Sequence, residues 1–105
     1  MNLHKNCNHE KLISYGFRKY GNIYRYNLPI YKYKDKVVIE CDFAVSLKDN
    51  TFEYEVIDNN TESSYIPYYN QSFSSFKNNI VYKKVSKAFN REIKKMMKES
   101  IIKDE

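Results

Sequence analysis

Six cationic side chains recur at helical spacing near the end of the chain. At 100° per residue they fall within an arc of about 100° on one side of a helix. Glu92 and Glu99 interrupt this segment, and neither lies in the arc. A row of cations on one helix face can neutralise successive phosphates of a nucleic acid, although it is also an ordinary solvated surface in a Lys-rich chain. We call this set the basic stripe: Lys84, Lys87, Arg91, Lys94, Lys95 and Lys98.

Two arginines form a second group of positive charge. Gly21-Asn22 is a two-residue hairpin signal, and this turn places Arg18 opposite Arg25. Like charges facing each other across a hairpin cost a few tenths to about 1 kcal/mol. An anion, an acidic partner or the chain's own acidic side chains would relieve this cost, and two arginines splayed into water are the alternative.

Tyrosines interleaved with cations form a third pattern. Stacking of bases on aromatic rings between cations is typical of single-strand binders. The Lys/Arg-Gly-aromatic signature of RNA-recognition motifs is absent. Tyrosine also favours strands, so a purely structural role stays open. The pattern comprises Tyr24, Tyr26, Tyr31, Tyr33, Tyr65, Tyr68 and Tyr69, with Arg25, Lys32 and Lys34.

No pattern of catalysis or metal binding stands out. Gly-rich phosphate loops, HExxH, GxSxG and CxxC are all missing. His4, Cys7 and His9 lack a fourth ligand at usual zinc spacing and lie near the chain end. We therefore predict a protein that is not an enzyme and has no metal and no cofactor.

Cap and turn residues, together with alternating or helical periodicity, predict the secondary structure. Asn8 is the N-cap of a short helix to Tyr15, ended by Gly16. A hairpin follows around Gly21-Asn22, with Phe17 facing Tyr26 as its outermost pair, and Pro29 marks an edge, bulge or break. Tyr65–Tyr69 is predicted to be a short edge strand.

The central hairpin has the clearest alternation. Val37, Ile39, Cys41, Phe43, Val45 and Leu47 share one face of a strand. A turn centred on Asp49-Asn50 would pair Leu47 with Phe52, Val45 with Tyr54 and Phe43 with Val56, all on one buried face. The opposite face then carries four acids: Glu40, Asp42, Glu53 and Glu55. We call these four residues the acidic face, and a basic protein partner is the ligand that it suggests.

From Ile80 onward the period becomes helical. Apolar residues gather on one side of this helix: Val81, Val85, Ala88, Phe89, Ile93, Met96 and Met97. The fold class is therefore α+β, a four- to five-stranded antiparallel β-meander packed by a long C-terminal amphipathic helix, with a short N-terminal helix. We expect one domain over residues 1–105, with residues 1–7 frayed and residues 70–79 a loop before the helix.

Charge is strongly segregated along the 105 residues, whose formal net charge is only +5. Residues 1–36 carry +6, residues 37–62 carry −6 and residues 63–105 carry +5. Lys, Asn, Ile, Tyr and Phe make up 54 of the residues, which indicates an AT-rich genome, such as that of a low-GC bacterium or its mobile elements. Because neither a membrane span nor a secretory signal is visible, a soluble cytoplasmic protein is expected.

The chain contains four short motifs: Gly16-Phe17-x-x-Tyr20-Gly21-Asn22-x-Tyr24, Val56-x-Asp58, Tyr65-x-Pro67, and Val81 to Val85 opening a Lys-rich helix. Together they resemble an accessory domain found next to YjbR/MmcQ-like domains in low-GC Gram-positive bacteria. The likeness spans roughly residues 12–97 and departs at Asn78-Asn79-Ile80. It implies an α+β intracellular module without catalytic residues. The YjbR-like domain, for which nucleic-acid binding has been proposed, has no counterpart here.

These observations favour a small binding module that contacts nucleic acid or a nucleoprotein through the basic stripe, with Arg18 and Arg25. The alternative is a protein-protein adaptor, or an inhibitor from a phage or mobile element, that uses the acidic face. Weak homodimerisation of basic helix against acidic face is a third possibility.

Overall fold

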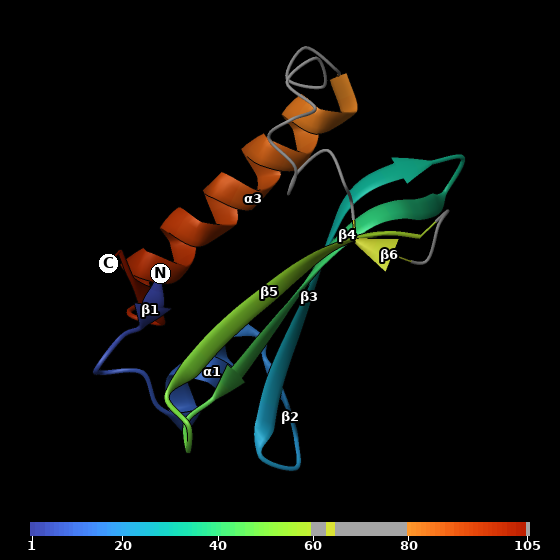
Figure 1. Cartoon of the computed structure of the whole chain (residues 1–105). Helices are drawn as coiled ribbons and strands as arrows, with labels where there is room; N and C mark the ends of the chain where they lie inside the picture. The colour runs from blue at the N-terminus through green and yellow to red at the C-terminus, as the bar shows by residue number, and fades with distance from the viewer. Residues whose placement is uncertain (60–62, 65–79, 105) are drawn as a thin grey trace.

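In the described part of the chain, five antiparallel strands follow one another in chain order to form a sheet, and one long helix lies across one face of it (Figure 1). This computed structural model describes residues 1–59, 63–64 and 80–104. The sheet contains β2 (Arg18–Tyr20), β3 (Ile23–Tyr33), β4 (Lys36–Ser46), β5 (Thr51–Asp58) and β6 (Ser63–Ser64). The remaining elements are β1 (Asn2–Leu3), α1 (His9–Tyr15), α3 (Ile80–Lys98) and β7 (Ile102–Lys103). The predicted α+β class, meander and C-terminal helix are confirmed.

The short N-terminal helix, α1, begins and ends as predicted. The Asn8 side chain accepts a hydrogen bond from the backbone N–H of Lys11 at 2.9 Å, which caps the first turn. At the other end, Gly16 has a φ of +125° and donates its N–H to the Ile13 carbonyl. A Cβ at Gly16 would lie 3.2 Å from the Tyr26 ring. Glycine therefore serves both the backbone turn and the packing of this ring.

The first hairpin, β2–β3, has the predicted register. Gly21 takes a φ of +61°, which a glycine adopts without strain. The predicted pair of Phe17 with Tyr26 is not part of the ladder, because β2 begins one residue later; instead their ring centroids lie 5.3 Å apart in the core. The pairs are Arg18–Arg25, Lys19–Tyr24 and Tyr20–Ile23.

The central hairpin, β4–β5, buries the predicted face, but the predicted register is wrong by two residues. Residues 47–50 all belong to the connection, in which the Asp49 N–H donates to Ser46 Oγ at 3.1 Å and Asn50 has a φ of +57°. Because side chains alternate with period two, a shift of two keeps the same side chains inward. The observed pairs are Cys41–Val56, Phe43–Tyr54 and Val45–Phe52.

Pro29 lies in β3, opposite Glu40, where the register shifts toward Tyr31. In the described part of the chain, β2 covers only the beginning of β3, so Pro29 lies on an open edge. The prediction of an edge or bulge is confirmed. The predicted strand at residues 65–69 and loop at residues 70–79 lie outside the described residues.

Helix α3 packs on the inner face of the sheet through its apolar side. Val85 and Met96 are fully buried, and the Phe89 ring stacks on Phe43 with centroids 6.1 Å apart. Tyr54, predicted to be buried, is 37% exposed, although its ring still packs against Phe89, with ring centroids 4.8 Å apart. The opposite side of the helix is thereby left facing away from the sheet.

The first residues of the chain are not frayed, contrary to the prediction. Leu3 is 5% exposed, and β1 pairs with β7, so that the two chain ends meet (Figure 1). After α3, Ser100 takes a φ of +61° while the Ile101 N–H donates to the Met96 carbonyl at 2.9 Å. This reversal turns the chain back and buries Ile101 and Ile102. Burial of Leu3 against this segment explains why the N-terminus is held.

Candidate nucleic-acid interface

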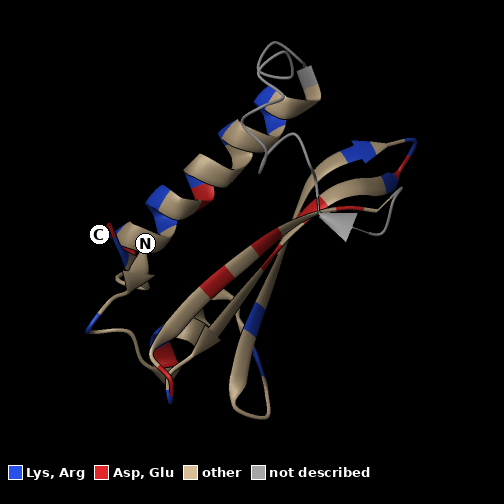
Figure 2. Cartoon of the chain, viewed as in Figure 1, with Lys and Arg blue, Asp and Glu red and all other residues tan. Residues whose placement is uncertain are grey.

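The basic stripe lies on the exposed side of α3. Each of its six cations is exposed, and Figure 2 shows Lys and Arg recurring along the helix. The residues that hold it there are the buried apolar ones on the opposite side of the same helix. The arc predicted from the sequence is therefore one continuous surface.

Glu92 turns away from the basic stripe and into the core, which the sequence analysis missed. It is 8% exposed, and the Tyr15 hydroxyl of α1 donates a hydrogen bond to its carboxylate. The sequence indicates this inward position, because Glu92 follows Val85 by seven residues. This spacing is close to two helical turns and places both residues on the same side of the helix. Its charge therefore faces the sheet, and the surface of the stripe keeps a single sign at this point.

Tyr15 and Tyr26 enclose this carboxylate. Burial, and then the hydrogen bond to Glu92, raises the pKa of Tyr15, and burial with the charge of Glu92 raises the pKa of Tyr26. Both hydroxyls therefore stay protonated at neutral pH and can donate to the carboxylate. The cluster joins α1, β3 and α3, and its role is to hold these elements together.

Two members of the basic stripe, one toward each end, lean over tyrosine rings. Lys84 Nζ lies 5.3 Å from the Tyr31 ring centroid, and Lys95 Nζ lies 5.3 Å from the Tyr15 ring centroid. Both distances are within the range of cation–π contacts. The stripe thus reaches from the distal part of β3 to α1.

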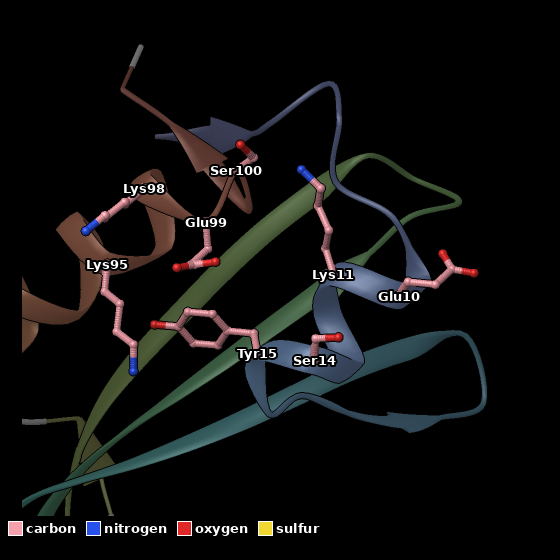
Figure 3. A pocket seen from close by; sticks show the side chains of 8 residues that line it. All are labelled: Glu10, Lys11, Ser14, Tyr15, Lys95, Lys98, Glu99 and Ser100. Carbon is pink, nitrogen blue, oxygen red and sulfur yellow. The ribbon is translucent and has the colours of Figure 1, made fainter.

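A groove of about 560 Å³ lies between α1 and the end of α3 (Figure 3). Lys95 and Lys98 of the basic stripe line it together with Lys11, but Glu10 and Glu99 line it as well. This mixture of signs makes it a poorer phosphate site than the open face of the helix. The remaining lining residues are Ser14, Tyr15 and Ser100.

Arg18 and Arg25 do not belong to the same surface as the basic stripe. They pair as predicted and both are exposed. Tyr24, beside Arg25, is 4% exposed and pairs with the buried Val45, so it belongs to the inner face of the sheet. Because neighbouring residues of a strand point to opposite faces, the arginines lie on the outer face of the sheet, away from α3. The structure therefore divides the predicted nucleic-acid site between two opposite faces.

Three residues of the acidic face lie beside Arg25. A hollow of about 230 Å³ on the outer face is lined by Arg25 together with Asp42, Glu53 and Glu55. The Asn27 amide donates to Asp42 at 2.6 Å, and the Asn59 amide donates to Glu40 at 3.2 Å. Asp42, Glu53 and Glu55 are therefore placed to offset the positive charge of Arg25.

The residues weighed as metal ligands have other hydrogen-bond partners. His4 Nδ1 accepts from the Asn6 N–H at 2.9 Å, and His9 Nδ1 lies 2.7 Å from the Tyr24 hydroxyl. Among the described residues, no group of three or more His, Cys, Asp or Glu side chains is placed to hold a metal ion.

Burial raises the pKa of Cys41 to about 12. That thiol is buried in the core as predicted.

In the described part of the chain, neither helix has the length and apolar character needed to cross a bilayer.

The comparisons with known proteins concern the fold. No protein-family model matches the chain, and no curated protein matches it in sequence. Among solved structures, it is similar to a DUF1831 family protein from Lactobacillus plantarum, with a TM-score of 0.71 and 12% sequence identity over 96% of this chain and 82% of that chain. At this identity the likeness concerns the fold and carries over no ligand or activity. The resemblance to the accessory domain of YjbR/MmcQ-like proteins stays a prediction. The chain therefore shares its α+β architecture with a protein of a low-GC Gram-positive bacterium.

Proposed function

We propose that the chain is a small non-enzymatic binding module that contacts nucleic acid, or a nucleoprotein, through the basic stripe. The observation that carries this proposal is the exposure of all six cations on one side of α3, while Glu92 in the same helix is buried. From Lys84 to Lys98 the row extends about 21 Å at 1.5 Å per residue. Such a row matches the repeated negative charge of a phosphate backbone.

The chemistry of this contact is electrostatic. Lys and Arg side chains displace the counterions around the phosphates, so affinity falls as salt rises. Contacts to phosphates position a protein without reading base sequence. The module would therefore bind many sequences. In this proposal it acts in the cytoplasm, as a monomer or weak dimer.

The acidic face supports the alternative of a protein-binding adaptor or inhibitor less well. Two of its four carboxylates already accept hydrogen bonds from Asn27 and Asn59, and Arg25 lines the same hollow as the other two. A basic partner would have to compete with these groups. Its test is charge reversal at Glu53 and Glu55, which abolishes capture of a protein partner only under this alternative.

Fluorescence anisotropy with a labelled oligonucleotide at low salt tests the main proposal. The double substitution Lys87→Glu/Arg91→Glu reverses two charges of the basic stripe. A phosphate contact at about 4 Å is worth roughly 1 kcal/mol in water, so the loss of two contacts alone should weaken binding by about 30-fold, and repulsion by the two new carboxylates should weaken it further. The control is Lys5→Glu/Lys48→Glu, which changes the net charge equally at two exposed positions outside α3.

Three results would contradict the proposal. They are the absence of binding by the wild-type chain to any DNA or RNA at low salt, an affinity indifferent to salt, and an equal loss of affinity in the control variant. The last result would assign the effect to net charge in place of the helix face.

A further inference from the structure

A small hollow lies where the distal part of the β3–β4 hairpin approaches the first turn of α3. Its volume is about 290 Å³, and its lining comes from three elements. Tyr31 and Tyr33 of β3 supply two aromatic rings, Lys36 and Val38 come from β4, and Val81 comes from α3. This volume falls at the lower end of the range of small-ligand pockets, about 300–1,000 Å³. The hollow therefore suits one flat ring system better than a larger ligand.

A lysine ammonium group lies close to each tyrosine ring of this hollow. Lys84 Nζ lies 5.3 Å from the Tyr31 ring centroid, and Lys34 Nζ lies 5.5 Å from the Tyr33 ring centroid. Tyr33 is 59% exposed, so part of its ring is open to a ligand. A ligand that pairs a flat, weakly polar ring with a nearby negative charge would satisfy both kinds of group.

The hollow is continuous with the basic stripe. Lys84 is the first member of the stripe, and it follows Val81, which lines the hollow, by three residues on α3. Residues three apart on a helix are neighbours on its surface. A nucleic-acid strand that lies along the basic stripe toward the beginning of α3 therefore reaches the two tyrosines.

We infer that this hollow receives an unpaired nucleobase, so that the nucleic acid bound by the module is single-stranded. The inference rests on the proposed function of the basic stripe and adds the substrate class to it. Stacking on a tyrosine ring requires an exposed base face, which a base within a duplex does not offer. Aromatic rings beside a positively charged track are the combination that binds single strands without reading their sequence. In this arrangement the nucleic-acid backbone lies along α3. The lysines at the rim of the hollow face the phosphates on either side of the bound base.

Binding of labelled oligo(dT) and oligo(U), measured by anisotropy with Tyr33→Ala, tests the inference. Loss of one stacking ring should weaken single-strand binding by about 5- to 150-fold, with the salt dependence unchanged. Tyr33→Phe keeps the ring and should bind like the wild-type chain. The matched control is Tyr20→Ala, because Tyr20 is 58% exposed on the β2–β3 hairpin and pairs with Ile23, outside the hollow. It should leave the affinity unchanged.

The same titration with a duplex of equal length completes the test. We expect weaker binding than to single strands, without an effect of Tyr33→Ala. Wild-type affinity in Tyr33→Ala, or an equal loss in Tyr20→Ala, would overturn the inference. If Lys87→Glu/Arg91→Glu still weakens binding in that case, the proposed function of the basic stripe is retained and only the inference about the hollow is overturned. Absence of all nucleic-acid binding would overturn both.

Discussion

Removal of one hydroxyl group, by Tyr15→Phe, should destabilise the fold markedly. The Tyr15 hydroxyl donates to the carboxylate of Glu92, which is 8% exposed. A hydrogen bond to a charged group contributes about 1.5–3 kcal/mol, and its loss leaves the buried carboxylate less well compensated. Tyr26 also hydrogen-bonds this carboxylate and keeps part of the compensation. We therefore expect Tyr15→Phe to lower the free energy of unfolding by about 1.5–3 kcal/mol while the chain still folds.

A double-mutant cycle measured by urea denaturation separates this interaction from general packing effects. Its members are Tyr15→Phe, Glu92→Gln and the double variant, and we expect a coupling free energy of about 0.5–3 kcal/mol. Tyr20→Phe is the control, since its exposed side chain should change stability by less than about 0.5 kcal/mol. Strict additivity of the two single substitutions would refute the reasoning, because it would mean that these side chains do not interact in the folded chain.

The pH dependence of stability gives the same interaction a second signature. Burial and Glu92 raise the pKa of Tyr15, so the folded chain retains a proton that the unfolded chain releases above about pH 10. This stabilising contribution is fully present below that pH and is lost progressively above it, as the pH rises toward the raised pKa of the folded chain. Tyr15→Phe should lose less stability between pH 8 and 11 than the wild-type chain does. Equal losses in urea titrations would contradict the assignment.

Three further predictions concern packing, helix ends and thiols. Leu3→Ala should lower the free energy of unfolding by about 2–5 kcal/mol, because Leu3 is 5% exposed; a loss near zero in urea would mean that the terminus is frayed after all. Thermal unfolding should show Gly16→Ala less stable and Ser100→Gly more stable, each by about 1 kcal/mol, because both positions have positive φ, and reversed signs would argue against these backbone angles. Burial raises the pKa of Cys41 to about 12, so a thiol reagent at pH 8 should modify Cys7 in the folded chain and Cys41 only after unfolding; rapid modification of both would contradict the buried position.

Local signals were sufficient to predict both described helices and strands β2 to β5. Asn8 and Gly16 mark the ends of α1, and Gly21 marks the first hairpin, because each residue has a specific backbone role there. The register of β4–β5 was wrong, since period-two alternation fixes which face is buried but does not distinguish shifts of two residues. Only the length of the connection before Thr51 decides between them.

The parts that sequence reasoning missed depend on contacts between distant segments. Strands β1 and β7 have two residues each, too few to show a period. Their pairing requires the whole chain to bring its ends together. The arginine pair lies opposite the basic stripe because Tyr24, next to Arg25 in β3, is buried on the inner face, and the β3–β4 register pairs Arg25 with Ala44 on the outer face. That register is set by a turn in which Lys34 and Asp35 both have positive φ, an uncommon conformation for such residues and therefore hard to predict.

The candidate site was predicted in part. Helical spacing alone placed the six cations of the basic stripe on one exposed side of α3. The inward position of Glu92 and the hollow beside Tyr31 depend on how α3 crosses the sheet, which periodicity does not specify. Sequence patterns therefore predicted the surface charge better than the shape around it.

The salt dependence of nucleic-acid affinity tests the central claim most directly. For single strands, log K should fall with log salt with a slope of about −0.7 for each phosphate neutralised. If Lys87 and Arg91 each contact a phosphate, Lys87→Gln/Arg91→Gln should make this slope less negative by about 1.4, by the same relation. A slope identical to that of the wild-type chain would contradict the claim that the exposed face of α3 binds the backbone.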